Sequence, residues 1–173
     1  MSKMEIRQSA YRKVGELVTL EPFSFNRFKE FYDLYLKTKE TWEEFLFLGF
    51  EDALDVKEFI GDQYKNHLFA GFFIIENTSN KLVGFIIGEQ DVEENVVMST
   101  FAIAQEFERK GYASETLFLF EVLMKSVGCE MLLNGCGLKN DACKSLFEKS
   151  GYLYLGAVSF YVFAELDFYF KKL

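Results

Sequence analysis

The chain has 173 residues, half of them hydrophobic, and it contains 21 Phe and 9 Tyr but only one Pro and one His. This length and composition suit a globular protein that buries a core, and they exclude an intrinsically disordered chain. The formal net charge of −8 disfavours nucleic-acid binding through a basic face. The same charge favours a cationic small substrate, or it serves solubility alone.

Targeting signals and metal-binding patterns are not expected in this sequence. It has no run of 18 apolar residues, and its N-terminus, MSKMEIRQSAYRKVGE, lacks the apolar core of a signal peptide. Cys129, Cys136 and Cys143 fit no zinc spacing, so we expect free thiols and no metal. We therefore predict a cytoplasmic protein without a membrane partner.

The first part of the chain predicts two helices followed by a meander of strands. The strands are assigned from alternating or continuous apolar residues, and the helices from aromatic residues at helical spacing. A turn at NTSNK joins two of the strands. The expected elements are a strand at 16–21, a helix at 25–37, an aromatic connector at 41–50, a helix at 52–66, and strands at 68–76, 82–90 and 95–104.

The second part alternates helices and strands. An apolar stripe predicts a helix after residue 111, for which Gly128 serves as the C′ residue, and Asn140 is a plausible N-cap of a later helix that closes at Gly151. Strands are expected at 130–136, 152–162 and 165–170.

This order of elements predicts a single α+β domain over residues 1–173. A crossover through a helix joins strand 95–104 to strand 130–136, so these two strands should be parallel in a mostly antiparallel central sheet. Helices should pack on both faces of that sheet.

Residues 105–116, QEFERKGYASET, link the third strand of the meander to a helix. The first N–H groups of a helix lack intrahelical partners, and the helix dipole adds positive potential, so a phosphate fits there. Gly111 allows close approach of the backbone, while Arg109 and Lys110 add charge. By itself, the loop fits a purely geometric role better, because many strand-to-helix junctions carry a Gly and a Lys.

Two segments together resemble the GNAT superfamily of acyl-CoA-dependent N-acyltransferases. QEFERKGYASE is similar to its pyrophosphate loop, Pro-Glu-Tyr-Arg-Gly-Lys-Gly-Tyr-Ala-Thr-Glu, and LKNDACKSLFEKSGYLYLG (138–156) resembles the segment in which an Asn opens a helix that ends in Lys-x-Gly-Phe. The element order matches from about residue 16 onward. Glu115 and Asp167 make the chain look most similar to the branch that acetylates ribosomal-protein N-termini and polyamines.

The resemblance implies an N-acetyltransferase that moves an acetyl group from acetyl-CoA to a primary amine of a small molecule or a protein N-terminus. Its sheet would carry a splay at the parallel pair. The strand end would pair with the pantetheine arm, the loop amides would bind the pyrophosphate, and an Asn would touch the cofactor arm. The matching residues are Phe101, Ala102 and Ile103 for the strand, Arg109, Lys110, Gly111, Tyr112, Ala113 and Ser114 for the loop, and Asn140.

The sequence departs from the family pattern at two positions. Glu108 replaces an Arg or Gln at the start of the loop, which places a carboxylate near the expected pyrophosphate. Phe147 stands beside the cofactor where many members have a Tyr that protonates the leaving thiolate. Cys143, one turn earlier, is a candidate catalytic group or a packed thiol. The alternative function is therefore a catalytically weak or inactive acyl-CoA-binding protein.

The acceptor side is less defined. Glu89 is the first candidate for the base that deprotonates the amine, ahead of Asp91, Glu93 and Glu94, and all four fit solvated turn residues equally. The aromatic C-terminal strands make a homodimer plausible because their edge would need cover. Candidates for lining the acceptor site are Trp42, Glu43, Glu44, Phe45, Phe47, Tyr152, Tyr154 and Tyr161.

Overall fold

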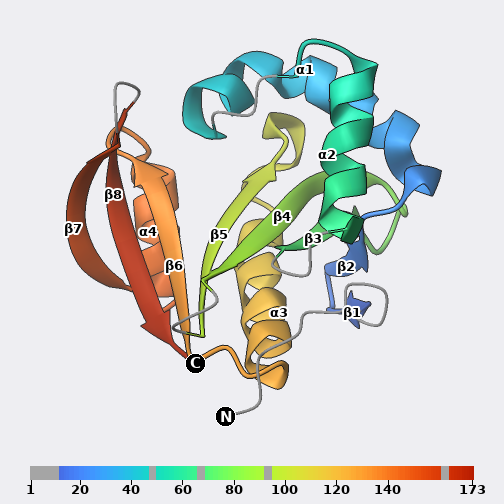
Figure 1. Ribbon diagram of the computed structural model, residues 1–173. Helices are drawn as coiled ribbons and strands as arrows, with labels where there is room; N and C mark the ends of the chain where they lie inside the picture. The colour runs from blue at the N-terminus through green and yellow to red at the C-terminus, as the bar shows by residue number, and fades with distance from the viewer. Residues whose placement is uncertain (1–11, 47–49, 66–68, 92–94, 161–163) are drawn as a thin grey trace.

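The computed structural model describes residues 12–46, 50–65, 69–91, 95–160 and 164–173 (Figure 1). Its helices are α1 (Phe28–Leu46), α2 (Ala53–Lys65), α3 (Tyr112–Ser126) and α4 (Asp141–Lys149), with short 3₁₀ turns at Phe25–Arg27 and Gln105–Phe107. Its strands are β1 (Lys13–Val14), β2 (Val18–Pro22), β3 (Phe69–Glu76), β4 (Leu82–Asp91), β5 (Val96–Ile103), β6 (Met131–Gly137), β7 (Leu153–Phe160) and β8 (Ala164–Lys172).

These strands form one sheet in the order β1-β2-β3-β4-β5-β6-β8-β7. Among the described strands, β5 and β6 are the parallel pair, joined from Val96–Ser99 to Met131–Asn134, and the other neighbours are antiparallel. Beyond Ser99 and Asn134 the two strands diverge, as Figure 1 shows for the yellow-green β5 and the orange β6. The predicted α+β fold and its parallel, splayed pair are confirmed.

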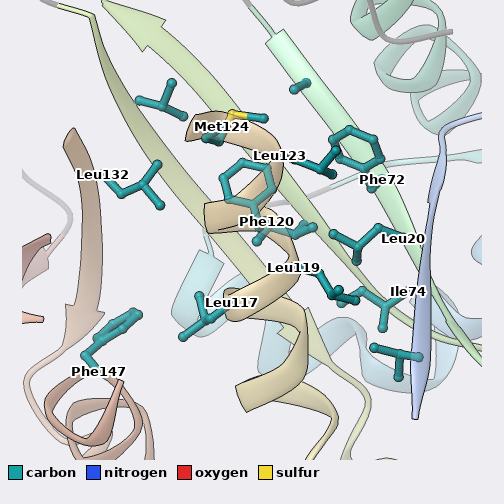
Figure 2. Packing of buried hydrophobic residues seen from close by; sticks show 14 of the residues in the cluster. Leu20, Phe72, Ile74, Leu117, Leu119, Phe120, Leu123, Met124, Leu132 and Phe147 are labelled. Carbon is teal, nitrogen blue, oxygen red and sulfur yellow. The ribbon is translucent and has the colours of Figure 1, made fainter. Parts of the chain in front are cut away.

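The sheet has two apolar faces. The first face is covered by α3 and α4, and Figure 2 shows Leu117, Phe120 and Met124 of α3 packed against the strands, with Phe147 on the α4 side. The second face is covered over β3 and β4 by α1 and α2, whose core includes Phe31 and Ile60. Helices therefore lie on both faces of the sheet, as predicted.

The main difference from the predicted elements is the length of α1. The helix continues to Leu46, through more than half of the segment that we expected to be a connector. No Gly or Pro occurs between Phe28 and Leu46, so nothing in the local sequence ends the helix there. The strand expected at 16–21 begins at Val18 and is preceded by the two-residue β1.

The ends of α3 and α4 follow the predicted capping pattern. Gly128 (φ 91°) directly follows Val127, the C-cap of α3, and Gly151 (φ 81°) directly follows Ser150, the C-cap of α4. Both glycines adopt left-handed conformations. This geometry ends a helix at little steric cost only for glycine. In the part of the chain that the structure describes, no helix is long and apolar enough to cross a membrane.

Candidate active site

A cavity of about 360 Å³ lies on the first face, where the end of β5 meets the starts of α3 and α4. It is lined by Phe101, Ala102, Ile103, Phe107, Glu108, Arg109, Gly111, Tyr112, Ala113, Ser114, Asn140, Ala142, Cys143 and Leu146. Residues far apart in the sequence thus meet at one place, and most of the predicted cofactor-binding residues are among them.

The start of α3 presents unpaired backbone N–H groups to this cavity. The first intrahelical bond joins the Glu115 N–H to the Gly111 carbonyl, so the N–H groups of Tyr112, Ala113 and Ser114 precede it and have no partner within the helix. Gly111 (φ 85°) and Arg109 (φ 59°) both adopt left-handed backbone conformations that shape the loop. Such a loop at a helix N-terminus can hold a phosphate group.

The first turn of α3 carries one acidic residue, Glu115, whose carboxylate does not line the cavity. Glu115 accepts the N–H groups of Glu16 and Leu17 at 2.8 Å and that of Val18 at 2.6 Å. These three bonds hold its negative charge against the N-terminal end of β2. An anion in the cavity therefore meets the amides of α3 rather than this carboxylate.

Tyr112 and Lys110 form the outer wall of the loop. The Tyr112 hydroxyl donates to Glu76, whose pKa is lowered first by the hydrogen bond from Ser79 and then by this one. The Lys110 ammonium lies 5.1 Å from the centre of the Phe107 ring and 5.9 Å from that of Tyr112. Lys110 does not line the cavity, but its charge is exposed beside the entrance.

Asn140 joins a capping role to a place in the cavity wall. Its Oδ1 accepts the Cys143 N–H at 3.0 Å, which makes it the N-cap of α4. Because Asn140 also lines the cavity, the two roles weighed from the sequence are compatible in this geometry.

Cys143 lines the cavity and is paired with a second thiol. Its thiol donates a hydrogen bond to Cys136 on β6, which, with burial, raises the pKa of Cys143 well above the ordinary range. The raised pKa keeps Cys143 neutral, so it is a poor nucleophile and a reluctant proton donor. A packed thiol is the better description of Cys143 in this geometry.

Phe147 lies behind the cavity wall rather than in it. Its side chain is buried and packs on Phe101, Tyr152 and Tyr169, with ring centres 6.1, 5.4 and 5.3 Å away. No proton donor stands at this position. The Tyr152 side chain is buried, and burial raises the pKa of its hydroxyl. It belongs to the core of the first face and not to an open surface.

Glu89 lies on the second face, away from the cavity lining. A side chain at its neighbour Gly88 would meet Phe120 and Val97 on the first face, and successive residues of a strand alternate. Glu89 is exposed, and it pairs across the strands with Met98, one residue before the splay. Tyr154 also differs from its expected place, because its hydroxyl donates to Asp167 at 3.0 Å beside α4. The side chains of Trp42, Glu43, Glu44, Phe45, Phe47, Asp91, Glu93, Glu94 and Tyr161 lie outside what the structure describes.

Sequence reasoning missed a polar pair at the base of the splay. Ser99 Oγ donates to Asn134 Oδ1 at 2.5 Å, both side chains are buried, and they belong to the last paired residues of β5 and β6. The pair fixes the point at which the strands separate. It depends on the register of a parallel pair, for which the sequence carries no local signal.

Comparison with known families and structures identifies the class. The model of the acetyltransferase (GNAT) family matches residues 28–152. The protein is therefore an acetyltransferase of the kind that uses acetyl-CoA. The chain belongs to the acetyltransferase (GNAT) family. No curated protein sequence matches it.

Solved structures with this fold cover nearly the whole chain at low sequence identity. An acetyltransferase from Salmonella typhimurium that modifies the N-terminal serine of ribosomal protein L7/L12 superposes with a TM-score of 0.82 at 12% identity, covering 92% of this chain and 96% of that one. RimL in complex with coenzyme A gives 0.82 at 11% identity, with the same coverage. The microcin C7 self-immunity acetyltransferase MccE, in complex with acetyl-CoA and AMP, gives 0.79 at 15% identity, covering 92% and 94%.

Proposed function

We propose that this protein transfers the acetyl group of acetyl-CoA to a primary amine of a small molecule or a protein N-terminus. The observation that carries the proposal is the cavity at the splay, where the free amides of α3 lie beside the diverging edge of β5. The amides of Tyr112, Ala113 and Ser114 would bind the pyrophosphate, and Arg109 and Lys110 would add charge.

The cofactor arm would run from this loop along the exposed edge of β5. Phe101, Ala102 and Ile103 lie beyond the last residue paired with β6, so on that side their backbone groups are free for strand-like pairing with pantetheine. Asn140 of α4 would contact the arm from the other wall. The thioester would then lie near Phe101, at the base of the opening.

In the reaction, the neutral amine attacks the thioester carbonyl, the N–C bond forms and the C–S bond breaks. Backbone amides of β5 would polarise the carbonyl. Glu89 would take the amine's proton, directly or through water, because it is exposed on the second face and pairs across the strands with Met98, one residue before the splay. The departing thiolate of coenzyme A would take a proton from solvent, because Phe147 has none to give and Cys143 holds its own tightly.

The second candidate is an acyl-CoA-binding protein with weak or no turnover. Two observations favour it: Glu108 lines the cavity, and the position of Phe147 has no acid. The Glu108 carboxylate would oppose the pyrophosphate unless it points to solvent, and the exposed cations beside it offset that repulsion.

The remaining proposals concern the setting of the enzyme. One domain over residues 1–173 agrees with the single sheet to which all described strands belong. We also propose that the protein works in the cytoplasm. A homodimer would form through β7, an edge strand that exposes Leu153 and Leu155. Sedimentation velocity would test this proposal, because a single monomeric species would refute it.

The proposed function is tested by incubating the protein with acetyl-CoA and a panel of primary amines. Released thiol and the mass of the acetylated amine are both recorded. Amine-dependent thiol release with a matching product supports transfer. Saturable binding of acetyl-CoA without any product would favour the binding protein instead.

A further inference from the structure

One line of side chains crosses the second face of the sheet just beside the splay. The strand registers place Glu89 opposite Met98, Met98 opposite Leu133, Leu133 opposite Phe170, and Phe170 opposite Leu153. We call these five residues the acceptor row. It begins with a carboxylate on β4 and continues with four apolar residues across β5, β6, β8 and β7.

The apolar part of the row is a surface and not core. Met98 is 40% exposed and Leu153 is 62% exposed, whereas Leu133 and Phe170 are half-buried. None of the four belongs to the buried clusters on either face. Their neighbours on the strands, Leu132 and Tyr169, point into the core of the first face, which confirms the orientation of the row.

The row lies where an acceptor must approach. The cavity for acetyl-CoA occupies the first face between α3 and α4, so a nucleophile reaches the opening between β5 and β6 from the second face. The pair Ser99 and Asn134, which ends the β5–β6 ladder, is one residue further along than Met98 and Leu133. The row therefore forms the floor directly beside the opening.

We propose that the acceptor is a primary amine with a single positive charge on an apolar body. Its ammonium group would lie near Glu89 and its body across Met98, Leu133 and Phe170. This inference rests on the proposed transfer reaction and names its substrate class. Strands in a sheet lie roughly 4.8 Å apart, so the apolar part of the row spans about 14 Å, enough for an alkyl or aryl group of six or more carbons.

A second cation on the acceptor would find no partner along the row. It would lie on apolar side chains, where it loses part of its hydration without gaining a partner. Lys172, two residues beyond Phe170 on the same side of β8 and exposed, would repel it further. The geometry therefore disfavours polyamines, even though the net charge of −8 attracts them to the protein.

The test compares amines of equal length that differ only in a second charge. The kcat/KM for n-hexylamine is measured against that for 1,6-diaminohexane, and that for norleucinamide against lysinamide. We expect a preference of about tenfold or more for the monocation, as for other misplaced polar groups. A preference for the monocation in the first pair points to a simple alkylamine as the acceptor. The same preference in the second pair points to an α-amino group like that of a peptide.

The variant Met98→Glu makes the test specific to the row. A second carboxylate should lower kcat/KM for n-hexylamine about tenfold, raise it for 1,6-diaminohexane, and leave the Kd for acetyl-CoA unchanged. The matched control is Phe118→Glu, an apolar-to-acid change at a 61% exposed position on α3, which should leave the ratio as it is.

The possible outcomes separate the two proposals. Turnover with equal or reversed preference in both pairs, or an unchanged ratio in Met98→Glu, would overturn the acceptor row while leaving the transfer reaction intact. Binding of acetyl-CoA without turnover of any of the four amines would instead overturn the transfer reaction, and the acceptor row with it.

Discussion

The side chain of Glu115 joins the first turn of α3 to the backbone of Val18, with its Oε2 only 2.6 Å from the Val18 nitrogen. Two further N–H groups, of Glu16 and Leu17, complete the contact. This carboxylate therefore ties the N-terminal strand to the helix whose amides face the cavity, and it does so without opposing a bound phosphate.

Replacing Glu115 should destabilise the fold and weaken the cofactor site together. Glu115→Ala removes three charge-assisted hydrogen bonds, which partly exposed N–H groups recover from water, so we expect a loss of about 1–3 kcal/mol. That corresponds to a Tm lower by roughly 2–12 °C for a chain of this size. Thermal unfolding measures it, and Glu58→Ala, on the exposed side of α2, is the control and should change little. An unchanged Tm for Glu115→Ala would refute the structural role.

The second prediction separates cofactor binding from backbone strain at Gly111. Both Gly111 and Gly128 adopt left-handed conformations, so changing either to Glu should cost about 1–2 kcal/mol of stability. Gly128 has open space around it, whereas a side chain at Gly111 lies beside the amides of α3 and 3.1 Å from Leu17. Gly111→Glu should therefore abolish acetyl-CoA binding, and Gly128→Glu should retain it. If both folded variants bind acetyl-CoA with the same affinity, the loop is not part of the cofactor site.

The third prediction concerns the missing proton donor. Phe147→Tyr adds a hydroxyl to a buried ring that packs edge-on against Phe101, a residue of the cavity wall. We expect kcat to rise about tenfold, at the low end of the usual contribution of a positioned acid. Phe147→Leu, which lacks both ring and hydroxyl, is the control and should not raise kcat. If kcat is the same in the wild type and Phe147→Tyr, protonation of the thiolate does not limit turnover.

The fourth prediction follows from the ion pair that fixes α4 to the sheet. Lys144 Nζ lies 2.5 Å from Asp167 Oδ2, and this contact, with the hydrogen bond from Tyr154, holds the pKa of Asp167 below its ordinary value of 3.8. A carboxylate with a lowered pKa stabilises the fold above that ordinary value and loses the contribution as pH falls through its folded pKa. The free energy of unfolding should therefore fall below about pH 4.

Asp167→Asn should lose stability at neutral pH and show a smaller fall under acid. The control is Asp33→Asn, which removes an exposed pair with Lys29, with side chains 52% and 85% exposed, and which contributes little. Chemical unfolding from pH 2.5 to 7 measures both variants. If the free energy of unfolding of Asp167→Asn depends on pH as that of the wild type does, the pair does not stabilise the fold.

The sequence predicted the features that depend on short local stretches of chain. It did not predict those that depend on the register between paired strands. The loop at 105–116 and the cap at Asn140 are contained in short stretches whose residue types dictate backbone geometry, so their places in the cavity could be anticipated. The contact of Glu115 with Val18 and the hydrogen bond of Ser99 with Asn134 join residues 97 and 35 positions apart. The acceptor row depends on four successive strand registers, in which a shift of one residue would reverse every side chain.

The residues predicted for the acceptor side illustrate the same limit. Tyr152 and Tyr154 are aromatic residues near the C-terminal strands, yet both lie on the first face beside α4. Their strand was predicted, but the face to which they point depends on its register with β8, in which Tyr154 lies opposite Tyr169 of the first-face core.

Calorimetric titration of the protein with acetyl-CoA, with dephospho-CoA and ATP as controls, tests whether the cavity is the cofactor site. We expect saturable binding of one acetyl-CoA per chain, its loss in Gly111→Glu, and no comparable binding of ATP. A folded wild-type protein that releases no heat and shows no saturation with acetyl-CoA would contradict the assignment of the cavity.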